Sequence, residues 1–485
     1  MLPAYTLDPR ELAGQIWSPD LLPEKRLWDR LVDSVVMLFQ RFTQPSINIS
    51  RADRRGYQRL CNNPRVNAAQ LAENAYQATA HAMRTSARVV LAHDSSEVSK
   101  LGLGEPDDAG PLRTIEARGY MMHGCTAIDA ATGARLGMFD VTAWTRSWRL
   151  RDGDARSRAP HKKESIKWRR LIRSAVKRAK TQGIEATLVH AMDREGDVHE
   201  NFTFARREGH QVLTRASSDR RVVSKHKMLW AHMEAQPVLD TDTLQVRSEI
   251  TIAARKKARS ADALLSLERK VAAMGSMREA KLKLRMGEVT FDPPAKRQRK
   301  QVTVNVVWVR EENAPHWAEP LEWMLLTTCE VQNVNEAWKL VGEYAMRWGA
   351  EDLHKVLKHG LGLEHDRVDS IESFRRQLAI LVPLATHVVQ WTYAAREKPG
   401  VAAAKYLSVD VLNAIGQAAK YAKLKVARTP RTLGEIVQRL AQLGGYEPVK
   451  NRPPGWQTVW RGWQRLMDFC DVLDFAKSRS RDAPD

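Results

Sequence analysis

The chain is most constrained by one stretch, residues 344–358, which reads YAMRWGAEDLHKVLK. A helix turns about 100° per residue, so residues spaced by three, four and seven positions fall on one narrow stripe. That stripe holds Tyr344, Arg347, Glu351 and Lys358, with Lys355 beside it. The opposite side is apolar and holds Met346, Ala350, Leu353 and Leu357. We therefore predict a helix that buries its apolar back and points its polar side chains outward.

The same spacing also fits an ordinary solvated helix face. Arg347 and Glu351 are four residues apart, which is the usual separation of a surface ion pair on a helix. Periodicity does not separate these two interpretations, so the rest of the chain has to decide between them.

The charge of the chain indicates a polyanionic partner. Its 485 residues include 77 Lys and Arg against 57 Asp and Glu, a formal net charge of +20. Basic proteins gain binding free energy by releasing counterions from phosphates, so nucleic acid is the natural partner. The membrane is the competing anionic surface. The longest apolar run, Leu378–Val389, is too short to span it and contains Pro383 and His387, so we expect a buried helix there.

The cysteines and the first residues favour an intracellular protein. The four cysteines, Cys61, Cys125, Cys329 and Cys470, form no CxxC pair, which argues against a zinc site and a disulfide framework. The start of the chain lacks the basic and apolar regions of a secretory signal. We expect reduced cysteines and a cytoplasmic protein.

The order of the expected elements predicts an α/β protein. Residues 1–85 have helical periodicity, with Asn67 as a helix cap. After them we expect a strand that ends at Asp94 and a hairpin over 120–144 with its turn at Gly133. A helix over 164–182 and a strand that ends at Asp193 should come next.

The next region has a different period. Residues 244–328 alternate apolar and polar side chains, which predicts an inserted, mainly antiparallel β region. Two basic clusters, Ala254–Arg259 and Lys296–Lys300, fall in its loops, either as solvated loops or as DNA-backbone contacts. From residue 335 onward the chain is expected to be helical again.

The stretch that opened this section resembles a known signature. Tyr-x2-Arg-x3-Glu-x6-Lys, here Tyr344, Arg347, Glu351 and Lys358, is similar to the motif of cut-and-paste transposases of bacterial insertion sequences, the insertion-sequence-four superfamily. Trp348 and the pair His354-Lys355 look most like the transposon-five branch. The resemblance extends from the N-terminal region to the C-terminal tryptophans.

The resemblance implies a three-part organisation. Residues 1–85 would form a helical domain that binds transposon ends, with Arg26 and Arg30 among its DNA contacts. Residues 86–395 would form a ribonuclease-H-like catalytic core that contains the β insertion at about 244–328. Residues 396–485 would form a helical dimerisation domain.

Three carboxylates are the expected catalytic residues: Asp94, Asp193 and Glu351. Taken singly, an Asp after a strand is usually a turn or cap residue. Taken together without paired His or Cys, three carboxylates suit hard, oxygen-binding ions, so we expect two Mg²⁺ ions, with Mn²⁺ as a substitute. Two such ions can activate a water or a 3′-hydroxyl and stabilise the leaving oxygen.

The resemblance also implies a reaction sequence and further DNA contacts. End nicking, hairpin formation, hairpin opening and strand transfer into target DNA would use one site. The phosphates near the cut would be bound by Arg347, Lys355, Lys358 and Tyr344. Arg215 would add a further DNA contact. Trp323 would receive the flipped base, and Trp348 would act as a second, probing tryptophan. The alternative for Trp323 is a place in the protein core, which is usual for a tryptophan in an apolar strand.

The C-terminal stripe has two interpretations. Trp456, Trp460 and Trp463 lie at i, i+4 and i+7, on one helix face. Such a stripe is either internal core or, as the resemblance implies, the contact of a homodimer that holds two DNA ends.

Three functions compete at this point. The leading hypothesis is a transposase that acts on double-stranded DNA. A catalytically silent end-binding or inhibitor protein is the alternative, although the complete set Asp94, Asp193 and Glu351 disfavours it. A stand-alone nuclease would need neither the N-terminal nor the C-terminal helices.

Overall fold

The computed structural model describes residues 9–41, 50–100, 106–113, 117–147, 164–247, 265–269, 271, 277–292, 301–448 and 454–481. Within these residues the protein is mixed α/β, with ten strands that pair mostly antiparallel. The chain divides into two compact units. The first holds Met1–Arg158, Lys177–Ala186 and Trp348–Asp485, and the second holds Ala159–Val176 and Thr187–Arg347.

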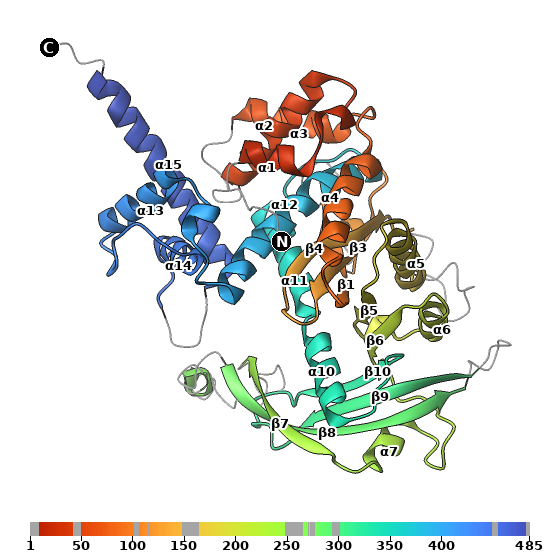
Figure 1. The fold of residues 1–485 in the computed structure, drawn as a ribbon. Coiled ribbons are helices and arrows are strands. Elements are labelled where there is room, and N and C mark those ends of the chain that lie inside the picture. Colours follow the sequence, from red (N-terminus) through yellow and green to blue (C-terminus); the bar gives the residue numbers. More distant parts are fainter. Residues whose placement is uncertain are drawn as a thin grey trace. The chain divides into compact units, whose positions relative to one another are not determined.

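The first unit begins with helices, as the sequence predicts (Figure 1). They are α1 (Pro9–Ile16), the short η1 (Pro19–Leu21), α2 (Lys25–Arg41), α3 (Arg51–Asn62) and α4 (Ala68–Met83). Leu31, Val35 and Leu38 recur at helical spacing and are buried. The predicted cap at Asn67 is confirmed, because its Oδ1 accepts hydrogen bonds from the backbone amides of Ala69 and Gln70.

Four strands follow in the first unit: β1 (Arg88–Ser99), β2 (Gly110–Pro111), β3 (Arg118–Asp129) and β4 (Arg135–Trp144). β3 and β4 form the predicted hairpin, with Gly133 in the left-handed region at φ +74°. The prediction that β1 ends at Asp94 is wrong. The strand runs five residues further because Ser95 to Ser99 stay paired with β3, and this pairing outweighs the weak strand propensity of Ser and Glu.

The C-terminal part of the first unit is helical, as expected. It contains α11 (Trp348–Lys355), the π-helical turn η5 (Val356–Gly360), α12 (Ile371–Glu397), η6 (Ala403–Lys405), α13 (Val409–Tyr421), α14 (Leu433–Leu443) and α15 (Trp456–Arg481). α12 is long and apolar enough to cross a membrane, yet most of it is buried against α3, α4 and β4. The expected buried helix around Pro383 is therefore confirmed.

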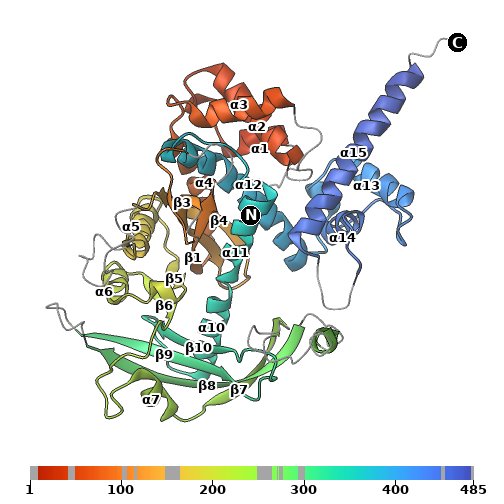
Figure 2. The same cartoon turned by 180° about the vertical axis from the view of Figure 1, so that it is seen from behind.

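The C-terminal tryptophans belong to the core of this unit. Trp460 is 2% exposed and its ring centroid lies 5.7 Å from that of Phe39; Trp463 is also buried. α14 and α15 lie side by side in both views, and a Cβ at Gly462 would overlap the carbonyl oxygen of Leu440 (Figures 1 and 2). The core interpretation of the stripe is thus the correct one, and the expected dimer has to use another surface.

The second unit contains the β insertion. Its elements are α5 (Ile166–Thr181, of which 177–181 group with the first unit), β5 (Thr187–Met192), η4 (Arg194–Gly196), α6 (His199–Arg207), β6 (Gln211–Arg215), α7 (Leu229–Glu234), β7 (Asp240–Arg247), β8 (Met277–Phe291), β9 (Val302–Glu311), β10 (Glu322–Thr327) and α10 (Val334–Ala345).

Strand pairing in this unit follows the order β5-β6-β10-β9-β8-β7. β5 and β6 are parallel, and each later neighbouring pair is antiparallel, which confirms the predicted antiparallel insertion. β7, β8 and β9 form a long twisted ribbon (Figure 1). The basic clusters Ala254–Arg259 and Lys296–Lys300, and the expected strand beyond Arg247, lie outside the described residues.

The prediction of one continuous helix over residues 344–358 is wrong. α10 ends at Ala345, and the amide of Arg347 bonds the carbonyl of Tyr344 in a tight i→i−3 turn before α11 starts. Gly349, a poor helix former, follows directly. The break falls at the boundary of the two units, so Tyr344 and Arg347 belong to the second unit and Glu351 and Lys358 to the first.

Candidate active-site residues

Asp94 lies in the middle of β1, opposite Gly124 of β3. Its Oδ2 is 3.0 Å from Nδ1 of His354, a mostly buried side chain on α11, and α11 packs across β1. A carboxylate paired with an imidazole N–H holds the ring in one orientation. The sequence did not reveal this contact of His354 with Asp94; the position of His354 three residues after Glu351 was the available signal.

Glu351 is on the same helix as His354, one turn earlier, and is partly exposed. The helix is fixed from behind. Ala350 and Leu353 are buried, and the hydroxyl of Tyr393 on α12 donates to Asp352 at 3.0 Å. The unit therefore brings the elements carrying two of the three predicted carboxylates, Asp94 and Glu351, together.

Gly349 has a structural role at the start of α11. A Cβ at this position would overlap the guanidinium of Arg135, which stacks over the Tyr393 ring at 4.3 Å from its centroid. A side chain at residue 349 would displace the Arg135 guanidinium, which packs the first turn of α11 against β4 and α12.

Lys358 lies in the π-helical turn and contacts the end of β1. Its Nζ donates to the backbone carbonyl of Glu97 and lies 3.3 Å from Oε1 of Glu364, which also accepts from the amide of Ser99. Lys355, by contrast, is exposed. Of the two lysines predicted to bind phosphate, one is therefore held in a polar network and the other extends into solvent.

Lys100 anchors this network from inside. Its fully buried ammonium donates to the carbonyls of Leu363 and Asp366 and to Oε1 of Gln377 at 2.5, 2.9 and 3.2 Å. A buried lysine needs such a complete set of acceptors. These bonds fix the segment that carries Glu364, and a lone lysine after a polar strand gave no sequence signal for this role.

Asp193 directly follows β5 in the second unit, as predicted, and caps η4. Its Oδ1 accepts from the amide of Glu195 at 2.9 Å, and its carbonyl accepts from Thr214 Oγ1 at 2.8 Å. The interpretation of this residue as a cap is therefore confirmed.

The turn after Asp193 is fixed by a buried ion pair. The carboxylate of Asp197 is completely buried and pairs with Arg220, while the amide and hydroxyl of Ser217 donate to it at 2.8 and 3.0 Å. Arg220 also stacks over Phe291 at 4.5 Å. Burial lowers the pKa of Arg220 to about 10. The pair ties the turn to the segment after β6.

Aromatic packing surrounds the remaining predicted residues of this unit. Trp323 on β10 is 4% exposed, and its ring meets Tyr344 edge-on at 5.2 Å between centroids. Burial raises the pKa of Tyr344, whose hydroxyl is hydrogen-bonded by Arg347. The expectation that Tyr344 points outward is therefore wrong, because its ring completes an apolar cluster.

Arg215 ends β6, opposite Leu325 of β10. Burial lowers the pKa of its guanidinium, the neighbouring Arg194 acts in the same direction, and Tyr344 is close enough to oppose it. Five of the predicted residues therefore lie close together in the second unit, at one end of its strands and of α10. They are Asp193, Arg215, Trp323, Tyr344 and Arg347.

Three other predicted DNA contacts lie in the first unit. Trp348 is 49% exposed, which is unusual for a tryptophan. Arg26 is exposed and pairs with Glu24. The exposed Arg30 rests its guanidinium over Gly56 of α3, where a Cβ would crowd it.

The described residues contain no group of three or more His, Cys, Asp or Glu side chains that could hold a metal ion. Asp94 and Glu351 belong to the first unit and Asp193 to the second, and each unit is described by itself. Carboxylate oxygens are the ligand type that suits Mg²⁺ and Mn²⁺. No protein-family model matches the chain.

Proposed function

We propose that the protein is a metal-dependent DNA transposase with a ribonuclease-H-like core, a helical end-binding region and a helical C-terminal region. The observation that carries this proposal is the arrangement on β1 and α11. The residue of the signature that should be catalytic, Glu351, lies on a helix that packs across the strand of Asp94 and contacts it through His354. An ordinary solvated helix face would not explain this contact between the helix of Glu351 and the strand of Asp94.

Each residue then has a separate task in cutting DNA. His354 orients the Asp94 carboxylate, and the α11 anchors at Arg135 and Tyr393 fix the direction of Glu351. Lys358 and Lys355 hold phosphate oxygens on one side of the scissile bond. Arg347 and Arg215 do so in the second unit, beside the Asp193 turn.

Asp94, Asp193 and Glu351 would hold two Mg²⁺ or Mn²⁺ ions, which supply an activated oxygen nucleophile and charge stabilisation at phosphorus when bound. In nicking, a water oxygen bonds to phosphorus as the bond to the 3′-oxygen breaks. In hairpin formation the freed 3′-hydroxyl oxygen attacks the opposite strand in the same way. No covalent bond to a protein side chain is needed.

The partners follow from the same proposal. The substrate is double-stranded DNA, namely transposon ends and target, and a homodimer would hold two ends in one complex. Its site of action would be the bacterial cytoplasm and nucleoid. Because Trp460 and Trp463 are core, the dimer contact must come from other C-terminal residues. The alternative, a silent inhibitor protein, predicts end binding without cutting.

The test is cleavage of the duplex that flanks the gene. The purified protein should nick its terminal inverted repeats only with Mg²⁺ or Mn²⁺. Asp94→Ala, Asp193→Ala and Glu351→Ala should each lose at least about a thousandfold in rate, since each would remove a metal ligand. Electrophoretic mobility shifts with the same duplex should persist.

Asp352→Asn is the matched control, because it removes a carboxylate next to Glu351 while its amide oxygen can still accept the Tyr393 hydroxyl that anchors α11. It should retain cleavage within about tenfold. Binding without metal-dependent cutting by the wild type would establish the inhibitor alternative, and a variant among the three that cuts at the wild-type rate would remove its residue from the site.

A further inference from the structure

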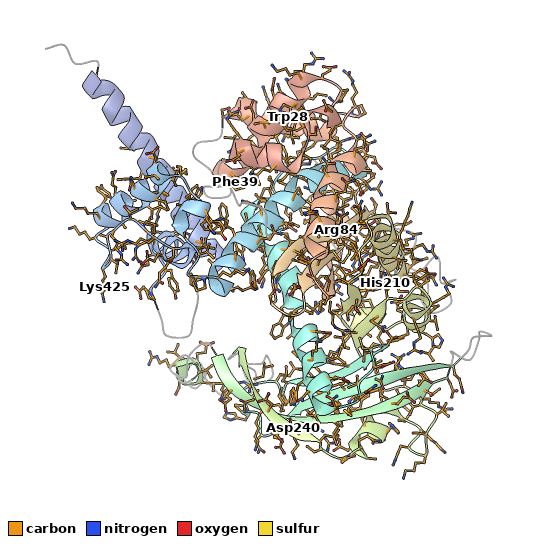
Figure 3. All side chains as sticks on the ribbon, viewed as in Figure 1. Trp28, Phe39, Arg84, His210, Asp240 and Lys425 are labelled. Carbon is orange, nitrogen blue, oxygen red and sulfur yellow. The ribbon has the colours of Figure 1, made fainter. Side chains whose placement is uncertain are left out.

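The segment after α13 is strongly basic and exposed. Five cations occur between residues 420 and 431, and no Asp or Glu occurs from residue 420 to 434. The cations, all exposed, are Lys420, Lys423, Lys425, Arg428 and Arg431. Figure 3 shows the Lys425 side chain extending away from the ribbon. Glu435 pairs with Arg428 at 2.8 Å, and among the described residues the other four have no carboxylate at ion-pair distance.

A solvated helix end explains only part of this charge. Lys420, in the last turn of α13, is favourably placed next to the negative end of the helix dipole. That effect fades within one turn, so it does not account for Lys425 or Arg431, which lie beyond the helix.

The backbone at Lys423 is a second, independent observation. α13 ends in a Schellman motif, in which the amide of Lys423 bonds the carbonyl of Lys420 and the amide of Leu424 bonds that of Ala419, both at 3.0 Å. Lys423 therefore adopts the left-handed conformation, at φ +54°. The same motif ends α5, α6 and α14, where Gly183, Gly209 and Gly445 take this position. Only α13 of these four helices has a charged side chain where glycine is the unstrained choice.

The segment also displays aromatic and apolar side chains. Tyr421 is 80% exposed although its ring centroid lies 5.7 Å from that of Phe469 on α15. Val426 is exposed as well. Cations interleaved with an exposed aromatic ring are typical of nucleic-acid-binding surfaces.

We propose that residues 420–431 form a docking surface for the phosphate backbone of duplex DNA, independent of its sequence. The strained Lys423 backbone directs a cation outward beside Lys425 and Arg431, and Tyr421 packs against the sugar–phosphate edge. This inference rests on the proposed function only for the choice of DNA as the polyanion. The surface lies on α13 and its following loop and contains none of the predicted catalytic residues.

A triple variant, Lys423→Gly, Lys425→Ala and Arg431→Ala, tests this surface. Glycine relieves the backbone strain at residue 423, so the fold should be as stable as the wild type by thermal unfolding. Affinity for a random-sequence duplex at about 0.1 M salt should fall roughly tenfold to a hundredfold, and the slope of log affinity against log salt should decrease by about 2 to 3. The charge-matched control removes three exposed lysines elsewhere in the chain. It combines Lys339→Ala, Lys398→Ala and Lys405→Ala.

Each outcome decides the inference. If the triple variant and the charge-matched control lose affinity equally, the segment is not a docking surface and only net charge acts. If the wild type binds vesicles containing phosphatidylserine but not duplex DNA, the surface binds membranes, and the proposal that it binds DNA is wrong. If the triple variant cuts cognate ends normally yet loses random-duplex binding, both proposals hold. If the wild type cuts no DNA but the triple variant loses duplex binding, the proposed function fails and the docking surface stands.

Discussion

In the first unit Asp94 is held by polar contacts, whereas in the second the surroundings of Asp193 are held by buried rings and one buried ion pair. His354, Lys358, Glu364 and Lys100 are joined to β1 or to the segment beside it by hydrogen bonds, and several of them reach solvent. Trp323, Tyr344 and the carboxylate of Asp197 are closed off from solvent or nearly so, and Arg220 is mostly buried.

This difference indicates what each region contributes. The partly exposed members of the polar network, Lys358 and Glu364, cost little stability to alter, and Lys358 can exchange its partners for DNA phosphates. A buried aromatic cluster defines a rigid surface, and altering it unfolds its surroundings. We therefore expect substitutions in the second unit to act first on stability, and those in the first to act first on cleavage.

The largest effect should come from Trp323→Ala. Removing a fully packed indole ring from β10 leaves a cavity beside Tyr344 and should cost about 3 to 5 kcal/mol in the free energy of unfolding. Hydrogen exchange in β9 and β10 would report this loss for the second unit alone. Trp323→Phe keeps a ring and should lose less than half as much. Wild-type protection together with a loss limited to hairpin formation would show instead that the ring serves DNA and not the core.

Asp197→Asn should have the next largest effect. The amide keeps the shape of the side chain but leaves the buried Arg220 without its carboxylate, at a cost of about 2 to 3 kcal/mol. Exchange should accelerate at residues 193–198 and 216–220, and nicking should slow because the Asp193 turn loses its anchor. Asp242→Asn, at an exposed position, is the control. Unchanged exchange would mean that the turn is held by Ser217 and Thr214 alone.

The sequence predicted the elements well and the details of the site less well. Short apolar strands, the Gly133 turn and the Asn67 cap are local features, so periodicity and turn chemistry located them. The ends of β1 and of the helix around residue 346 depend on partners distant in sequence: the pairing of Ser95–Ser99 with β3, and the contact of Arg135 with Gly349. No local pattern encodes such contacts.

One outward assignment failed and one stripe stayed ambiguous for the same physical reason. Tyr344 was assigned outward by helical face, and the stripe of Trp460 and Trp463 was left open between core and dimer contact. A face shows only that residues lie together, not whether another element covers them. Conversely, His354 and Lys100 gain their roles from contacts across the first unit, at Asp94 and at Leu363 and Asp366.

Lys358→Met should have a small effect on stability and a large one on cutting. Its contacts with Glu364 and the Glu97 carbonyl are partly solvated, so we expect a loss of no more than about 1 kcal/mol in unfolding free energy. Cleavage should fall more than binding, because the lysine is proposed to hold a phosphate at the cut. Lys355→Met, one turn away and exposed, should leave stability unchanged. A loss of several kcal/mol would place Lys358 with the structural residues.

Trp348→Ala should have the smallest effect on stability, within about 0.5 kcal/mol, because half of the ring is already in water and it lies at the first residue of α11. Its effect on chemistry should be selective. An exposed ring that stacks on a base is worth about 1 to 3 kcal/mol, so hairpin formation should slow roughly tenfold to a hundredfold while the first nick proceeds normally. Denaturing gels separate nicked from hairpin product. Trp348→Phe retains a stacking surface and should recover most of the rate. Destabilisation equal to that of Trp323→Ala would show that the two tryptophans have the same structural role, and the contrast between the two units would no longer hold.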